Sequence, residues 1–227
     1  MTFSKDTVIK VVKKLKESMA KFMEMPFEKL KIHISKGNSK IGHTHNFSLA
    51  PIVTCSNCQK CKYSCYDVKA CNQYKNVVTA RAENTVMVLK NMSGTFDQID
   101  EYMAKRKRNF FFRFHVSGEI INSDYFTHVV KIGMKYYNWR VLIYTKNYEI
   151  INNWIDENGK YPENLTVMFS KWYGLPCNNP HNLPTFTCFP EGAEPLKGAW
   201  HCPGNCDICK NAKRGCFYGE SAWTYEH

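Results

Sequence analysis

The sequence predicts an α/β fold with a parallel sheet, preceded by one helix and followed by a cysteine-rich tail. Over residues 48–169, short apolar segments alternate with segments of helical periodicity, which is the pattern of right-handed βαβ units. The run at 110–116 is apolar at almost every position, as strands buried on both faces of a parallel sheet are. A chain of 227 residues can bury such a core without disulfides.

The helices are predicted from apolar spacing and from capping residues. We expect an amphipathic helix over 6–24 with Asp6 as its N-cap. Its apolar stripe consists of Val8, Val12, Leu15, Met19 and Phe22. Further helices are expected at 72–91, 95–106, 123–137 and 148–156. The last of these should end at Asn158-Gly159, because glycine favours the backbone conformation that closes a helix.

The strands are predicted at 30–34, 48–54, 110–116, 141–144, 165–169 and 185–189. The strand at 48–54 would carry Cys55 at its carboxyl end. Ligand sites of parallel sheets gather at the carboxyl ends of the strands, so the polar residues there are candidate site residues. Along the chain these are Cys55, His115, Ser117, Gly118, Glu119, Thr145, Lys146, Ser170 and Lys171.

The chain is therefore expected to have three parts. Residues 1–36 form an N-terminal helix and a β segment that pack on the core. Residues 37–190 form the α/β core and carry the first group of cysteines. Residues 191–227 form the cysteine-rich tail, which we expect to be held by a second metal site and to have little regular structure of its own.

Eleven cysteines make sulfur chemistry the main functional signal of the sequence. An N-terminal cysteine group comprises Cys55, Cys58, Cys61, Cys65 and Cys71, and a tail cysteine group comprises Cys202, Cys206, Cys209 and Cys216. The chain opens without an apolar signal segment, which predicts a cytoplasmic protein in a reducing compartment. Structural disulfides are rare there, and an odd number of cysteines cannot all pair, so metal ligation is the favoured interpretation.

The two groups predict different kinds of metal site. The tail spacing, Cys202-x3-Cys206-x2-Cys209 with Cys216 further on, suits a closed four-thiolate site that holds either a [4Fe–4S] cluster or Zn²⁺. In the N-terminal group the short spacings overlap and leave the liganding subset open. Cys71 is either a ligand or a buried core thiol. His43 and His45 are either further ligands or surface histidines of a loop.

The charge of the chain points to a polyanionic or anionic partner. The formal net charge is +11, which suits nucleic acid or an anionic small substrate, although a solvated basic surface explains the same number. The run Lys105-Arg106-Lys107-Arg108 is either a solvated helix end or part of a binding patch. No apolar stretch is long enough for a membrane span, so no membrane partner is expected.

Several motifs follow one another in a fixed order that resembles the phage gene-product-88 domain family. They span most of residues 38–216 and comprise 38–40, 46–51, the cysteines 55, 61 and 65, 112–119, 144–146 and Cys202-Pro203. This resemblance implies a phage or mobile-element origin and no particular activity.

A more distant similarity is to the first half of the radical S-adenosylmethionine (SAM) partial barrel. It rests on the order strand, cysteine loop, helix, strand ending at Ser117-Gly118-Glu119, helix, and strand ending at Thr145-Lys146. The resemblance implies a partial (βα) barrel in which Cys55, Cys61 and Cys65 hold a [4Fe–4S] cluster whose fourth iron binds SAM. The spacing Cys55-x5-Cys61-x3-Cys65 departs from the usual Cys-x3-Cys-x2-Cys of that superfamily, and Cys58 is an additional candidate ligand.

The resemblance also implies roles for the other candidate residues. Glu119, Lys146 and His115 would be catalytic. Ser117, Gly118, Glu119, Thr145 and Ser170 would bind the cofactor SAM. The tail cysteines would hold an auxiliary cluster, and a flavodoxin or ferredoxin would supply electrons.

Two functional hypotheses follow from the sequence. The first is a radical-SAM-like iron–sulfur enzyme with an unknown substrate. The second is a non-catalytic nucleic-acid-binding protein of phage or mobile-element origin, stabilised by zinc or iron–sulfur.

Overall fold

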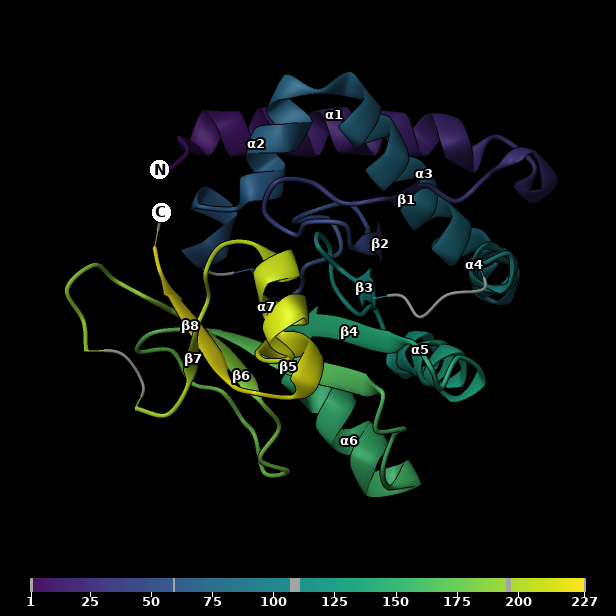
Figure 1. The fold of residues 1–227 in the computed structure, drawn as a ribbon. Coiled ribbons are helices and arrows are strands. Elements are labelled where there is room, and N and C mark those ends of the chain that lie inside the picture. Colours follow the sequence, from purple (N-terminus) through teal and green to yellow (C-terminus); the bar gives the residue numbers. More distant parts are fainter. Residues whose placement is uncertain (1, 59, 107–110, 195–196, 227) are drawn as a thin grey trace. The chain divides into compact units, whose positions relative to one another are not determined.

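The computed structural model describes residues 2–58, 60–106, 111–194 and 197–226 (Figure 1). Within this part of the chain it confirms the predicted mixed α/β class, with seven α-helices and a mostly parallel eight-stranded sheet. The strands lie in the order β1-β2-β3-β4-β5-β6-β8-β7. They are β1 (Ile34–Ser35), β2 (His45–Phe47), β3 (Phe111–Phe114), β4 (Arg140–Thr145), β5 (Leu165–Trp172), β6 (Thr185–Phe189), β7 (Trp200–His201) and β8 (Ala222–Tyr225).

The chain divides into two compact units. The first unit consists of Met1–Ile34, Phe47–Arg108 and His115–Ile121. The second unit consists of Ser35–Asn46, Asn109–Phe114 and Asn122–His227. The described helices include none that combines the length and the hydropathy needed to cross a membrane.

Helices dominate the first unit. They are α1 (Lys5–Met23), α2 (Tyr66–Gln73), α3 (Lys75–Lys90) and α4 (Met92–Ala104), with the short 3₁₀ helices η1 (Phe27–Lys29) and η2 (Lys60–Tyr63). The predicted first helix is present. Its N-cap is Ser4 and not Asp6, because the Ser4 hydroxyl accepts a hydrogen bond from the Thr7 amide at 3.2 Å.

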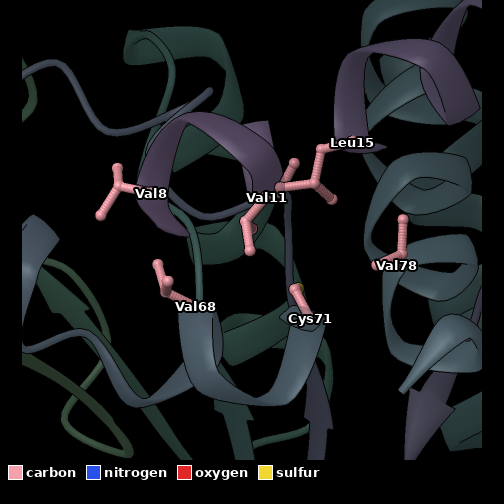
Figure 2. Close-up of a cluster of buried hydrophobic side chains, with 7 residues drawn as sticks. Val8, Val11, Leu15, Val68, Cys71 and Val78 are labelled. Carbon is pink, nitrogen blue, oxygen red and sulfur yellow. The ribbon is translucent and has the colours of Figure 1, made fainter. Parts of the chain in front are cut away.

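Helix α1 buries one apolar stripe against α2 and α3 (Figure 2). From α1 the stripe contributes Val8, Val11 and Leu15, so Val11 replaces the predicted Val12 among the buried residues. Val68 and Cys71 of α2 and Val78 of α3 complete the labelled cluster. Because both α2 and α3 cover this stripe, the chain bends between them.

That bend corrects the single helix predicted over 72–91. Tyr74 takes extended backbone angles, φ −123° and ψ 116°, and ends α2 one residue before α3 begins. A buried ion pair joins the two helices. The Arg81 Nε and Nη2 atoms donate to the Asp67 carboxylate at 3.0 and 3.2 Å, and only 2% of the Asp67 side chain is exposed.

The predicted strand over 48–54 is also wrong. The strand at this point is β2, which ends at Phe47, and the chain then turns over 51–54. Outside any ladder, the Ala50 amide donates to the Thr85 hydroxyl at 2.8 Å and the Leu49 amide donates to the Ser117 carbonyl at 3.0 Å. These bonds satisfy the buried backbone without a neighbouring strand, so a turn and not a strand end carries Cys55.

In the second unit, strands β3 to β6 lie parallel in chain order. The crossover helices α5 (Ser123–Lys135) and α6 (Tyr148–Asn158) contact one another, since the Trp154 indole lies edge-on to Phe126 at 5.1 Å and donates to the Thr127 hydroxyl at 2.9 Å. The two helices therefore cover the same face of the sheet (Figure 1). Asn122 is the N-cap of α5, and α6 ends at Gly159 as predicted.

The opposite face of β4 and β5 is covered by the tail. Leu142 and Met168 form a buried cluster with Phe217 of the 3₁₀ helix η3 (Cys216–Tyr218). The tail also contains α7 (Cys206–Ala212), and its last strand β8 lies parallel between β6 and β7. The expectation of a tail with little regular structure is wrong, because its own apolar residues, Phe217, Ala222 and Trp223, are buried.

Candidate metal centres

The loop of the N-terminal cysteine group brings three thiols into contact. The sulfur atoms of Cys58 and Cys61 lie 3.4 Å apart, and Cys58 also forms a hydrogen bond with Cys55. The bond with Cys58 lowers the pKa of Cys55, against its burial, whereas the bonds with Cys55 and Cys61 raise the pKa of Cys58. The sulfur atoms of the three residues therefore lie within hydrogen-bonding range of one another along a single loop.

The two remaining thiols of this group have different surroundings. Cys65 directly precedes α2 and packs against the cluster around Val68, and burial raises its pKa to about 12. Cys71 lies inside α2 with 1% of its surface exposed, and burial raises its pKa to about 12 as well. The environment of Cys71 is that of a core thiol, which decides between the two alternatives for this residue.

The turn at 117–119 lies against the cysteine loop within the first unit. The Ser117 hydroxyl donates to the Leu49 carbonyl at 3.1 Å, and the Glu119 amide donates to the Thr54 hydroxyl at 3.2 Å. Glu119 is 6% exposed, and its charge raises the pKa of Cys55, although the hydrogen bond from Cys58 and burial act more strongly. A buried carboxylate therefore stands beside the three contacting thiols.

Packing accounts for Gly118. Its φ is +82°, and a Cβ placed on it would lie 2.6 Å from the Leu49 Cβ and 2.9 Å from two Leu49 backbone atoms. His115 is the other unusual residue here, since it is buried, has φ +57°, and donates its amide to the Phe47 carbonyl at 2.9 Å. His115 and Gly118 therefore determine how the segment 115–118 packs against the segment 47–49.

The polar residues at the ends of β4 and β5 belong to the second unit. The Thr145 hydroxyl accepts a hydrogen bond from the Asn147 amide at 2.9 Å and so shapes the turn into α6. Lys146 Nζ donates to the Ser170 hydroxyl at 3.1 Å, so these two predicted residues contact one another. Lys171, which follows Ser170 in β5, is half-buried.

The tail cysteine group is arranged around α7. Cys202 follows β7, Cys206 is the first residue of α7, Cys209 lies one turn further along it, and Cys216 begins η3. The Trp200 indole donates to the Cys209 sulfur at 3.3 Å. This local geometry depends on Asn205, whose side chain caps α7 by accepting from the Asp207 amide at 2.8 Å.

The four tail thiols interact electrostatically. Burial raises the pKa of Cys206, Cys209 and Cys216, the last to about 12, and the charge of Cys202 raises all three further. A hydrogen bond with the Tyr144 hydroxyl acts in the opposite direction on Cys216. Cys202 therefore lies close enough to Cys206, Cys209 and Cys216 to influence their pKa values.

The donor chemistry of both groups fits a thiophilic metal. Among the described residues, no three His, Cys, Asp or Glu side chains converge on one point, so the thiols are grouped but not set in coordination geometry. Thiol ligands suit iron–sulfur clusters and zinc. His43 is engaged elsewhere, because its Nδ1 atom lies 3.0 Å from Asp207, and His45 begins β2.

Two signals were missed at the sequence level. The run Cys55-x2-Cys58-x2-Cys61-x3-Cys65 has the spacing of bacterial ferredoxin loops, which identifies Cys58 as a ligand candidate equal to its neighbours. Arg113 stands beside the tail cysteine group, with its guanidinium carbon 4.2 Å from the centre of the Tyr144 ring. The one sequence signal for this placement is the alternation of side chains along β3, which puts Arg113 on the same face as Phe111.

The fold and the two cysteine groups define an α/β protein with a mostly parallel sheet, one thiol-rich loop and a thiol-rich tail. The chain belongs to the family described as Gene product 88, whose family model matches residues 13–172. The match begins inside α1, further towards the N-terminus than the motifs that carried the resemblance, and it includes the N-terminal cysteine group and the turn at 117–119. The tail cysteine group lies beyond the matched residues. No curated protein and no solved structure matches the chain.

Proposed function

We propose that this protein is an iron–sulfur enzyme of the radical-SAM type, with its reactive centre at Cys55, Cys58 and Cys61. The observation that carries the proposal is the contact among these three thiols, with 3.4 Å between the sulfurs of Cys58 and Cys61, beside the buried carboxylate of Glu119. Cys58 replaces Cys65 in the predicted ligand set, because Cys65 packs into the hydrophobic cluster next to α2.

Three thiolates leave one iron of a cubane cluster without a protein ligand. When bound and reduced, a cluster of this kind supplies the electron that cleaves SAM into methionine and a 5′-deoxyadenosyl group. The electron would come from a flavodoxin-like or ferredoxin-like donor. A basic protein surface, with a formal net charge of +11, suits such acidic donors.

The residues of the turn have defined tasks in this proposal. The Thr54 hydroxyl donates to the Ala50 carbonyl at 2.9 Å and accepts from the Glu119 amide, which fixes the turn against the cysteine loop. Glu119 would accept a hydrogen bond from the amine of SAM. A charge-assisted bond of this kind contributes ~1.5–3 kcal/mol. Gly118 and Ser117 would act indirectly, by holding Glu119 in place.

The strand order supports a partial (βα) barrel. Strands β3, β4, β5 and β6 follow one another in the sheet as they do in the chain, with α5 and α6 on one face. A doubly wound fold would instead reverse its strand order at a switch point. Lys146, bonded to Ser170, lies at the carboxyl ends of β4 and β5, where the ligand sites of parallel sheets gather.

The test begins with anaerobic purification and analysis of iron, acid-labile sulfide and zinc. The reduced, iron-loaded protein should change its spectrum on addition of SAM and should release 5′-deoxyadenosine. Glu119→Gln should keep its iron but weaken SAM binding about 10-fold or more. Glu83→Gln is the matched control, because Glu83 is also a buried carboxylate of the first unit but bonds to His33 at 2.6 Å.

Two results would overturn the proposal. The first is a colourless anaerobic preparation that contains zinc and no sulfide. The second is an iron-replete protein that neither responds to SAM nor cleaves it. Either result would favour the metal-stabilised nucleic-acid-binding protein, for which salt-dependent binding to single-stranded and double-stranded DNA is the direct assay.

A further inference from the structure

The bend between α2 and α3 carries an exposed aromatic ring. Tyr74 joins the two helices with extended backbone angles, and 57% of its surface is exposed. On either side of it in the chain, Cys71 and Val78 are buried in the cluster with α1, so packing fixes the bend while the ring stays outside (Figure 2). Within the described part of the chain, the Tyr74 side chain has no hydrogen-bond partner and no ring contact. The fold therefore makes little use of this ring.

Lysines from two helices accompany the ring. Lys14 of α1 donates to the Asn72 carbonyl at 3.4 Å, and Asn72 lies shortly before Tyr74 in the chain. Lys10 lies one helical turn before Lys14 on the same flank of α1, because residues four apart are neighbours on a helix surface. Lys75 follows Tyr74 directly as the first residue of α3. Lys10 and Lys75 are exposed, and we refer to Lys10, Lys14, Tyr74 and Lys75 as the Tyr74 face.

The Tyr74 face has little negative charge around it. The segment 68–82 contains no acidic residue. Asp67 and Glu83, which border this segment, are both buried and hydrogen-bonded within the first unit. Helix α1 carries six lysines against two acidic residues. Two like charges one turn apart, such as Lys10 and Lys14, are slightly unfavourable for a helix, and an anion placed against them offsets that cost.

We propose that the Tyr74 face binds single-stranded nucleic acid. The ring would stack on one base, and the lysines would contact the phosphates that flank it. Single-strand-binding surfaces combine aromatic rings and lysines in this way, because every base offers a π face and every linkage a negative charge. In a duplex the neighbouring bases cover those π faces, so the ring has a partner only among unpaired bases. The inference goes beyond the proposed function, since it concerns a helical surface whose binding needs neither iron nor SAM.

Charge and stacking together define the partner. The bond of Lys14 to a carbonyl at the end of α2 fixes its charge near the ring, and the helix dipole favours a cation there. The lysines alone would suit any polyanion, including an acidic protein surface, but only bases make use of the ring. Substitution of Tyr74 therefore separates this proposal from nonspecific electrostatic binding.

The test measures fluorescence anisotropy of labelled oligo(dT) and oligo(U) of about 20 nucleotides, which is longer than the ~4–16 nucleotides of typical single-strand sites, with the full-length protein. A duplex of the same length is compared at the same salt concentration, and the tighter of the two single strands identifies DNA or RNA as the partner. Tyr74→Ala should weaken binding about 5- to 150-fold, whereas Tyr74→Phe should retain it. Lys10→Gln combined with Lys75→Gln should reduce the slope of log affinity against log salt concentration by ~1.4, because each phosphate contact contributes ~0.7.

The second unit offers matched controls. Tyr137 is 80% exposed just after α5, and Tyr137→Ala should leave the affinity unchanged. Lys131→Gln combined with Lys160→Gln removes the same number of exposed charges and should leave the salt slope unchanged. Circular dichroism verifies that each variant is folded. If Tyr74→Ala does not fold, Tyr74→Leu carries the test, because it keeps apolar bulk without the ring.

Several results would overturn the proposal. They are a wild-type protein that does not bind either oligonucleotide at low salt, a duplex bound as tightly as the single strands, and a folded Tyr74→Ala protein with wild-type affinity. An equal loss in Tyr137→Ala would show that the effect is not specific to this face. Competition by polyglutamate as effective as that by oligo(dT) at equal charge would show a surface that accepts any polyanion. None of these results bears on SAM cleavage, which is measured separately on the iron-loaded protein.

Discussion

Replacing Gly118 with alanine measures how tightly the turn beside the cysteine loop is packed. Two costs combine at this position. An L-residue at φ +82° costs ~1 kcal/mol relative to glycine. The added Cβ would lie 2.6 Å from the Leu49 Cβ and 2.9 Å from its backbone, and overpacking of this kind costs ~1–3 kcal/mol. The sum is ~2–4 kcal/mol, which corresponds to a decrease in melting temperature of ~4–16 °C.

The assay is thermal unfolding followed by circular dichroism, with Gly174→Ala as the control. Gly174 has φ +75°, and no atom lies within 4 Å of the position that an alanine methyl group would take. Its replacement should therefore cost only the backbone term of ~1 kcal/mol, or ~2–4 °C. A Gly118→Ala protein that melts within about 2 °C of Gly174→Ala would refute the packing argument. The glycine would then be better explained by close approach of a ligand to the backbone.

Three further predictions test the buried ion pair and the two cysteine groups. Asp67→Asn should lower the free energy of unfolding, measured by urea denaturation, by ~3–5 kcal/mol, because it leaves the Arg81 guanidinium buried without a counter-charge; a loss below ~1 kcal/mol would show that the pair is solvated. Cys58→Ser should remove iron from the N-terminal cysteine group while Cys65→Ser retains it, and iron analysis with the reverse order would restore the ligand set predicted from sequence. Cys206→Ser should lose the tail metal but remain folded, as judged by metal content and circular dichroism, and insoluble expression would contradict this.

Most of the fold could be predicted because its signals are local. The apolar runs that became β3, β4 and β5 and the capped helices α5 and α6 lie close to their predicted bounds. The segment after Phe47 failed because its buried backbone groups are satisfied by Thr85 and Ser117, which are distant in sequence. A buried segment outside the sheet has the same apolar sequence pattern as a buried strand, and only its tertiary hydrogen bonds distinguish it from a strand.

The candidate sites were predictable to the extent that cysteine spacing encodes them. The sequence predicts the Cys55 loop and the turn at Glu119 to be neighbours as the ends of two parallel strands. In the structure a turn carries Cys55, and the hydrogen bonds of Leu49 with Ser117 and of Glu119 with Thr54 bring the two segments together. Arg113 could not be found in this way, because its relation to Cys216 passes through the stacking on Tyr144 and the packing of a segment about 100 residues further along the chain. The last two residues of the basic run, Lys107 and Arg108, lie outside the described residues.

The packing of the tail decides how much of its structure depends on metal. Phe217 is 2% exposed against Leu142 and Met168, and β8 pairs with β6 over four residues from Ala222 to Tyr225. Burying one such aromatic side chain contributes ~1.5–3 kcal/mol, and the sheet satisfies the backbone of β8 independently of any thiol. Classical zinc fingers, by contrast, have almost no core and unfold without metal. The tail should therefore stay on the sheet whether or not its thiols hold a metal.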